Sequence, residues 1–311
     1  MNQLLFVPLL AVTLLVVLIV GIVRVVRNRD LRTGAAGADL RAVERWTTLW
    51  RWVGVLLGAC LAVAALAQQD VSLGRLALAA PAIAGCSVLL AIMVGEWTIR
   101  PSSAQRRTAS LTSRSFATLV PRARLWVTAT GIATLATLLG IGMATASPDD
   151  QGRAGRAITA TCVQDLPGIG STVLTATNGP WPGSYYALPA ALIMLATIGF
   201  GIVAARAIRD RANPDSSHAA YDTHLRRDAM RRVVSAIGAT AWGTAGPIAI
   251  VMSSALHGND CVTGGDPFAG AALLIALISL VIAMVLTATV LLPARAPQAS
   301  ARENSAPRVR S

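Results

Sequence analysis

The chain has 311 residues, of which 54% are hydrophobic and only 14% are charged. Soluble domains carry about 25% charged residues, so this composition excludes an ordinary soluble domain and favours the lipid bilayer as the solvent. The net charge is +12, and all 27 basic residues are arginine. Because these arginines gather in short segments between apolar runs, we interpret them as topology signals and expect no nucleic-acid partner.

Seven apolar runs have the length of a membrane-crossing helix, which needs about 20 residues. The runs are approximately Leu4–Val23, Trp52–Ala67, Leu76–Gly95, Leu125–Ala146, Tyr185–Ala205, Val233–Leu256 and Phe268–Leu292. The second run is the shortest, and we expect its helix to extend back toward Trp46. The sequence therefore predicts an all-α membrane protein, a seven-transmembrane-helix bundle over residues 1–293.

The arginines also predict which side each loop faces. The first run is not a cleaved signal peptide, because Met-Asn-Gln has no positive charge and arginines follow the run instead. Alternate loops and the tail hold 24 of the 27 arginines, and the exceptions are Arg75, Arg153 and Arg156. Cytoplasmic loops carry such an excess, so we expect the N-terminus outside and the C-terminus in the cytoplasm. Residues 294–311 are too polar to pack and are predicted to be a disordered cytoplasmic tail.

Two arginine-rich segments have helical amphipathic spacing. One includes Leu40 and Trp50 before the second run, and the other includes Tyr221 and Ala229 before the sixth. The second segment also holds Arg226, Arg227, Arg231 and Arg232. We expect both segments to lie along the membrane interface, with arginines beside anionic headgroups. Docking of a membrane-protein partner is the alternative interpretation.

Candidate catalytic residues are scarce. A P-loop needs a lysine, which this chain lacks, and its three histidines do not have the spacing of a metal site. The middle of every predicted span lacks charged side chains, which counts against a proton-coupled carrier. Glu96 comes nearest, at the end of the third run, where it can pair with Arg100. We therefore predict no catalytic site, no cofactor and no metal.

The four cysteines divide by position. Cys60 and Cys86 fall inside predicted helices, whereas Cys162 and Cys261 fall in two loops on the predicted outer side. Disulfides persist in oxidising compartments, so we predict a Cys162–Cys261 disulfide that orders the outer loop 147–184 as an extracellular cap. The Gly-rich stretch 167–171 is interpreted as a turn within this loop. Asp149, Asp150, Asp165, Asp260 and Asp266 make the cap the first place to look for a ligand.

Two stretches carry a family resemblance. Glu96-Trp97-Thr98-Ile99-Arg100-Pro101 precedes a Ser- and Arg-rich loop, and Tyr221-Asp222 precedes Leu225-Arg226-Arg227. Together they resemble uncharacterised multi-pass membrane proteins of actinobacteria. The resemblance implies a bacterial plasma-membrane location and transfers no activity.

These observations favour a non-enzymatic polytopic plasma-membrane protein with a structural, accessory or sensory role. The alternative is a small-molecule permease or transporter subunit that uses weakly polar contacts. An outer polar cavity would favour a sensor, a continuous midplane cavity a permease, and a solid bundle core an accessory protein.

Overall fold

Six helices and one β-hairpin make up the part of the chain that the computed structural model describes, residues 38–68, 74–98, 119–166, 170–211, 219–259, 261 and 267–292. The helices are α2 (Ala38–Ala67), α3 (Arg75–Trp97), α5 (Arg122–Thr145), α6 (Ser184–Asp210), α7 (Ala219–His257) and α8 (Pro267–Leu291). The hairpin strands are β1 (Ile158–Leu166) and β2 (Gly170–Asn178). The predicted first span, Leu4–Val23, and the predicted tail, 294–311, lie outside the described residues.

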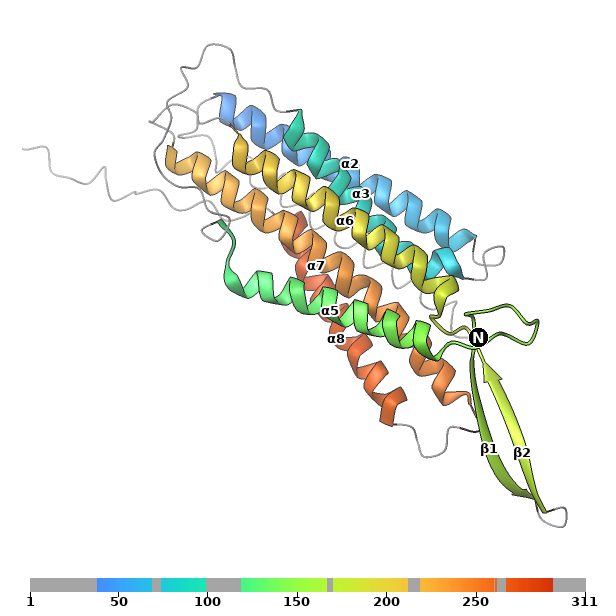
Figure 1. Cartoon of the computed structure of the whole chain (residues 1–311). Helices are drawn as coiled ribbons and strands as arrows, with labels where there is room; N and C mark the ends of the chain where they lie inside the picture. Colours follow the sequence, from blue (N-terminus) through green and yellow to red (C-terminus); the bar gives the residue numbers. More distant parts are fainter. Residues whose placement is uncertain are drawn as a thin grey trace, which may run out of the picture. The chain divides into compact units, whose positions relative to one another are not determined.

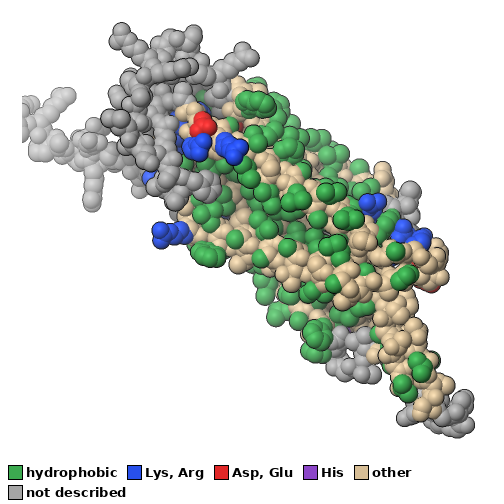
Figure 2. Space-filling model, viewed as in Figure 1, with side chains coloured by type: hydrophobic (Ala, Val, Ile, Leu, Met, Phe, Trp, Pro, Cys, Tyr) green, Lys and Arg blue, Asp and Glu red, His purple; other side chains and the backbone are tan. Residues whose placement is uncertain are grey.

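All six helices are long and apolar enough to cross a membrane. Their sides carry many exposed large hydrophobic residues, such as Leu56, Leu192 and Val281. In water such surfaces would associate, whereas lipid tails solvate them. Figure 2 shows these hydrophobic side chains over the sides of the helices, with arginines toward the two ends of the same face. Six of the seven predicted spans are thus helices of the expected character.

Consecutive helices run in opposite directions along the bundle (Figure 1). The starts of α2, α5 and α7 therefore share one end with the last turns of α3, α6 and α8. We call this end the arginine end. The opposite end, where α5 leads into β1 and β2 leads toward α6, is the hairpin end.

Helix α7 is the central element of the bundle. In its most apolar window 72% of residues are buried, against 28% to 39% in the other five spans. Trp242 of α7 donates from Nε1 to the carbonyl of Val127 at 2.9 Å and packs over Gly131. On another side, Ser253 donates to the carbonyl of Ala269 at 2.8 Å. Helix α7 thereby joins α5 to α8 through its own side chains.

Small residues let α2 and α3 approach closely. A β-carbon added at Gly54 would lie 2.7 Å from Cβ of Ala91, and one added at Gly58 would lie 2.7 Å from the carbonyl oxygen of Ala84. The GxxxG spacing of Gly54 and Gly58 therefore serves packing between two helices of the same chain.

Two expectations about the arginine-rich segments need correction. Helix α2 begins at Ala38 and runs without a break into its span, and α7 likewise begins at Ala219. Neither segment is a separate helix along the interface. Each segment continues directly into its span, and side chains of the first segment contact α3: Trp50 lies against Gly95, and Trp46 donates to Thr98 Oγ1 at 2.9 Å.

The close α2–α3 approach generates a stability prediction. Replacing Gly58→Leu should lower the free energy of unfolding by about 1–3 kcal/mol, the usual cost of overpacking. The measurement is the thermal midpoint of the detergent-purified protein. The matched control is Gly140→Leu, because nothing lies within 4 Å of a β-carbon at Gly140. Equal midpoints for the two variants would contradict the packing role of Gly58.

Candidate functional site

The loop predicted as a cap contains an antiparallel β-hairpin. Register pairs Ile158 with Asn178 at the base, Cys162 with Leu174 near the middle and Leu166 with Gly170 at the tip. Neither strand is expected from the apolar runs of the sequence, whereas the turn between them coincides with the predicted glycine-rich turn. Residues 167–169 of that turn lie outside the described residues.

The base of the hairpin is fixed to α5. Ser147 and Ala157 exchange backbone hydrogen bonds of 2.8 and 3.2 Å, which continue the pairing below β1. Trp181, after β2, is buried and donates from Nε1 to both Gly142 O and Thr145 Oγ1 at 3.1 Å. Both partners belong to the last turn of α5, whose final carbonyls have no helical partner of their own. The indole therefore completes that helix end and holds the cap against it.

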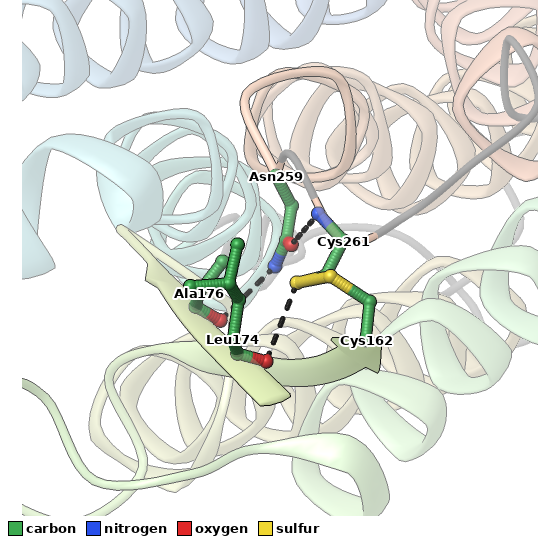
Figure 3. The surroundings of a disulfide bond; sticks show 5 residues. All are labelled: Cys162, Leu174, Ala176, Asn259 and Cys261. Carbon is green, nitrogen blue, oxygen red and sulfur yellow. Dashed lines mark hydrogen bonds between the residues drawn. A yellow bond between two sulfur atoms is a disulfide. The ribbon is translucent and has the colours of Figure 1, made fainter. Parts of the chain in front are cut away.

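The disulfide predicted from the sequence is present: Cys162 of β1 is bonded to Cys261, which follows α7 (Figure 3). Asn259 is buried beside it, accepts a hydrogen bond from Cys261 N at 3.1 Å and donates to Ala176 O of β2 at 3.3 Å. Sγ of Cys261 lies 3.6 Å from Leu174 O. At the base of β2, Asn178 donates to Ala255 O of α7 at 3.2 Å. One covalent bond and two amide side chains thus join the hairpin to the end of α7.

The other face of the hairpin is free of these contacts. Its side chains alternate with those facing the disulfide and are exposed to solvent: Thr159, Thr161, Val163, Val173, Thr175 and Thr177. We call this set the Thr/Val face. At its centre Val163 and Val173 are opposite one another and are 68% and 72% exposed. The sheet has only these two strands among the described residues, so its outer edges have no strand beside them.

The three arginines that break the topology pattern all lie at the hairpin end. Arg153 donates from Nε to Asp149 Oδ2 at 2.7 Å. The guanidinium groups of Arg75 and Arg156 lie 5.0 and 3.8 Å from the ring centroid of Tyr185, which is cation–π distance. A carboxylate and an aromatic ring thus compensate these charges locally.

Among the predicted cap acids, Asp149 has a structural role. Its Oδ1 accepts the backbone N–H groups of Gln151 at 3.1 Å and Arg153 at 2.8 Å, which closes the turn before β1. Desolvation raises the pKa of Asp149, but these hydrogen bonds and the Arg153 side chain outweigh it, so the pKa lies below its ordinary value. Asp260 and Asp266 lie outside the described residues, as does the side chain of Asp165.

A second cluster of polar side chains lies at the arginine end. Arg226 donates from Nε to Asp222 Oδ2 at 2.6 Å, and both side chains are 5% exposed. Its Nη1 donates to the carbonyls of Ile208 at 3.3 Å and Arg209 at 3.2 Å. A cation at the last carbonyls of a helix is favourable, so Arg226 ties α7 to the end of α6. The expectation that this arginine faces headgroups is wrong, because it points into the bundle.

Arg211 connects this pair to α3. Its Nη2 lies 3.4 Å from Asp222 Oδ1, and its Nη1 lies 3.5 Å from Glu96 Oε2. Glu96 is buried and has Arg211 as its ionic partner. Arg100, the partner that the sequence suggested, lies outside the described residues.

Further along α7, Asp228 pairs with two arginines. Arg232 lies on its Oδ2, and Arg231 Nη2 lies 3.4 Å from its Oδ1. Arg124 of α5 donates from Nη1 to Ser235 Oγ at 2.7 Å and to Thr289 Oγ1 of α8 at 3.1 Å. We call these groups the arginine cluster: Arg51, Arg124, Arg211, Arg226, Arg231, Arg232, Glu96, Asp222 and Asp228. Six cations and three carboxylates thus link five helices at one end of the bundle.

The disulfide generates a prediction about thiol chemistry. In unreduced, denatured protein, Cys60 and Cys86 should react with a thiol reagent, whereas Cys162 and Cys261 should react only after reduction. Peptide mass spectrometry makes the measurement. Reduction should also lower the thermal midpoint of the wild type. The loss in free energy of unfolding should be smaller than the roughly 4–5 kcal/mol that a loop of about 100 residues implies for a soluble chain, because inserted helices already restrict the unfolded state.

The control for that loss is the double variant Cys162→Ser, Cys261→Ser, whose thermal midpoint should not respond to reductant. If Cys162 and Cys261 both label fully before reduction, the bridge is absent.

The buried ion pair generates a further prediction. Replacing Asp222→Asn should lower the free energy of unfolding by about 3–5 kcal/mol, because Arg226 would keep a buried charge without its carboxylate. The matched control is Asp210→Asn. Asp210 pairs with Arg209 at 2.8 Å, but the two side chains are 62% and 49% exposed, so little loss is expected. Thermal midpoints of the two variants in detergent decide between them, and equal midpoints would contradict the role given to Asp222.

Comparison with protein-family models, with curated proteins and with solved structures finds no match to this chain. The resemblance to actinobacterial membrane proteins therefore stays a prediction, and the function is argued from geometry.

Proposed function

We propose that this chain is a non-enzymatic accessory protein of a bacterial plasma membrane, which presents its hairpin to a protein partner outside the cell. The proposal includes a seventh span at Leu4–Val23, an outer N-terminus and a cytoplasmic C-terminus. The observation that carries it is the hairpin itself: it is fixed to the bundle at three places, its Thr/Val face is exposed, and no further strand pairs with it among the described residues.

Two independent arguments support the orientation. The arginine end holds the short-loop arginine excess that marks the cytoplasmic side. The hairpin end holds the disulfide, which persists on the oxidising side. Charge and redox chemistry therefore support the same orientation.

The packing of α7 supports an accessory role over a permease. A carrier needs a polar path near the midplane between elements that move. Here the middle of α7 is in close contact with its neighbours. A β-carbon at Gly85 would overlap Thr240, and one at Gly238 would lie 2.7 Å from Thr128 Oγ1. Thr240 and Thr244 donate to backbone carbonyls one turn back, at 2.8 and 2.7 Å, so their hydroxyls are engaged within the helix.

The charged residues favour a structural role over catalysis. Glu96, Asp222 and Asp228 each have an arginine partner: Arg211 joins Glu96 of α3 to Asp222 of α7, and Asp228 pairs with Arg232 of its own helix. Asp149 closes a turn. The carboxylates that a sequence search would select as acids or bases are thus engaged in holding the fold.

Partner recognition by the hairpin follows from its chemistry. An exposed strand edge can extend into a partner's sheet through backbone hydrogen bonds, and side chains on one face give specificity. The Thr/Val face offers hydroxyl groups around the two apolar side chains of Val163 and Val173. The lipid bilayer is the other proposed partner, through the exposed apolar sides of the helices.

The proposal predicts accessibility and contact at the hairpin. In a background without Cys60 and Cys86, a Thr175→Cys variant in intact cells should react with a membrane-impermeant maleimide. With an impermeant thiol-to-amine cross-linker, the same variant should give one discrete heavier adduct. Both results are expected because Thr175 is exposed on the Thr/Val face. Immunoblotting of the tagged chain measures them.

Two control positions separate the parts of the proposal. Ser216→Cys, on the predicted cytoplasmic side, should resist the maleimide until the cells are lysed, and labelling without lysis would overturn the orientation. Gln151→Cys, exposed in the turn before β1, should label but give no adduct. If Thr175→Cys labels and forms no adduct, or forms the same adducts as Gln151→Cys, the accessory role is overturned.

A further inference from the structure

Arg51 is the unusual member of the arginine cluster. The residue is 3% exposed, and its Nη2 lies 3.4 Å from Thr48 Oγ1, a long contact. Its Nε and Nη1 are buried and have no hydrogen-bond partner. Buried arginines normally have a carboxylate or several carbonyls as acceptors. The donors of Arg51 therefore face a place where an acceptor is missing.

Arginines outnumber carboxylates in the arginine cluster by six to three. Two charged groups act on Arg51: Arg232, of like sign and the stronger of the two, and Asp228. Asp228 is already in contact with Arg232 and Arg231. A bound anion would reduce this excess of positive charge.

These residues lie toward the arginine end of the bundle. Arg51 is 16 residues before the end of α2, or about 24 Å along the axis at 1.5 Å per residue. Arg232 is 25 residues before the end of α7, about 38 Å by the same rise. The hydrocarbon core is about 30 Å thick, so both positions are nearer to the surface at the arginine end than to the middle of the span. The Arg231 side chain is 32% exposed, which leaves an approach from that surface.

We propose that Arg51, Arg231 and Arg232 form a binding site for a phosphate group at the arginine end of the bundle. Guanidinium groups match phosphate oxygens in charge and in the spacing of their donors, and they can bind two oxygens at once. The site would hold the phosphate of an anionic lipid headgroup or a free phosphate from the cytoplasm. The proposal rests on the fold of the bundle at the arginine end and does not depend on the hairpin.

The proposal predicts opposite effects of one substitution. Arg51→Met removes a buried charge without an acceptor, so the lipid-free protein should have a higher thermal midpoint than the wild type. The same variant should bind phosphatidylglycerol at least about tenfold more weakly, the loss expected for one charge-assisted hydrogen bond. A purely structural Arg51 would not produce a gain in stability together with a loss of binding.

The measurement is a titration of the detergent-purified full chain followed by its thermal midpoint, since a ligand that binds the folded state raises that midpoint. The titrants are phosphatidylglycerol, phosphatidylcholine and inorganic phosphate. The matched control is Arg227→Met, because Arg227 is exposed on the same turns of α7. This control should keep the affinity of the wild type.

The arms of the titration identify the source of the phosphate. Stabilisation by phosphatidylglycerol alone assigns the site to anionic headgroups, and stabilisation by inorganic phosphate as well assigns it to phosphate in general. Both results support the site only if Arg51→Met weakens the binding by about tenfold or more. Equal affinities of Arg51→Met and Arg227→Met, or no stabilisation of the wild type by any titrant, would overturn it. If Arg51→Met does not yield folded protein, Arg51→Lys replaces it and should bind more weakly than the wild type.

Discussion

The burial of α7 is the constraint on which the rest of this structure depends. Lipid tails are as apolar as leucine, so helices in a membrane associate through close packing and hydrogen bonds. Helix α7 provides both kinds of contact. Trp242 and Ser253 donate to the backbones of α5 and α8, and Gly238 admits Thr128 and Leu286 at close range. Both candidate sites lie at the ends of this helix, so its position sets theirs.

The arginines show how one residue type serves several purposes. Sequence alone assigns them to topology, and their distribution agrees with that role. The structure adds that Arg226 and Arg211 hold α3, α6 and α7 together through Asp222 and Glu96. At the hairpin end, Tyr185 lies beside both Arg75 and Arg156, which explains how these charges are accommodated there. A count of charges does not distinguish these arginines from one another, whereas the burial of each side chain and its contacts do.

The helices and the disulfide were predictable because each follows from a strong one-dimensional signal. Apolar runs of membrane length mark the helices, and alternation of the loops leaves only Cys162 and Cys261 on one side. The hairpin was missed because a search for long apolar windows passes over strands of nine residues. Its signal was present, since Thr159, Thr161 and Val163 alternate with residues of the other face. A connection longer than about 15 residues also indicates structure of its own.

The inward direction of Arg226 was not predictable in the same way. Its spacing to Asp222 is that of an ordinary surface pair on a helix. Only the position of α6, whose last carbonyls accept its hydrogen bonds, shows that this face is covered. Arg51 presents the same difficulty, because a lone arginine near the start of a span is usually counted as a flanking charge.

The 99-residue separation of the two bridged cysteines has a consequence for biogenesis in the proposed orientation. Cys162 crosses the membrane with the loop after α5, but its partner follows α7 and is synthesised two helices later. The covalent closure of the cap must therefore wait until α6 and α7 are inserted. Until then Cys162 is an open thiol, available to the oxidising enzymes of that compartment or to a wrong partner. The state of this one bond distinguishes a chain that has completed insertion of α7 from one that has stalled before it.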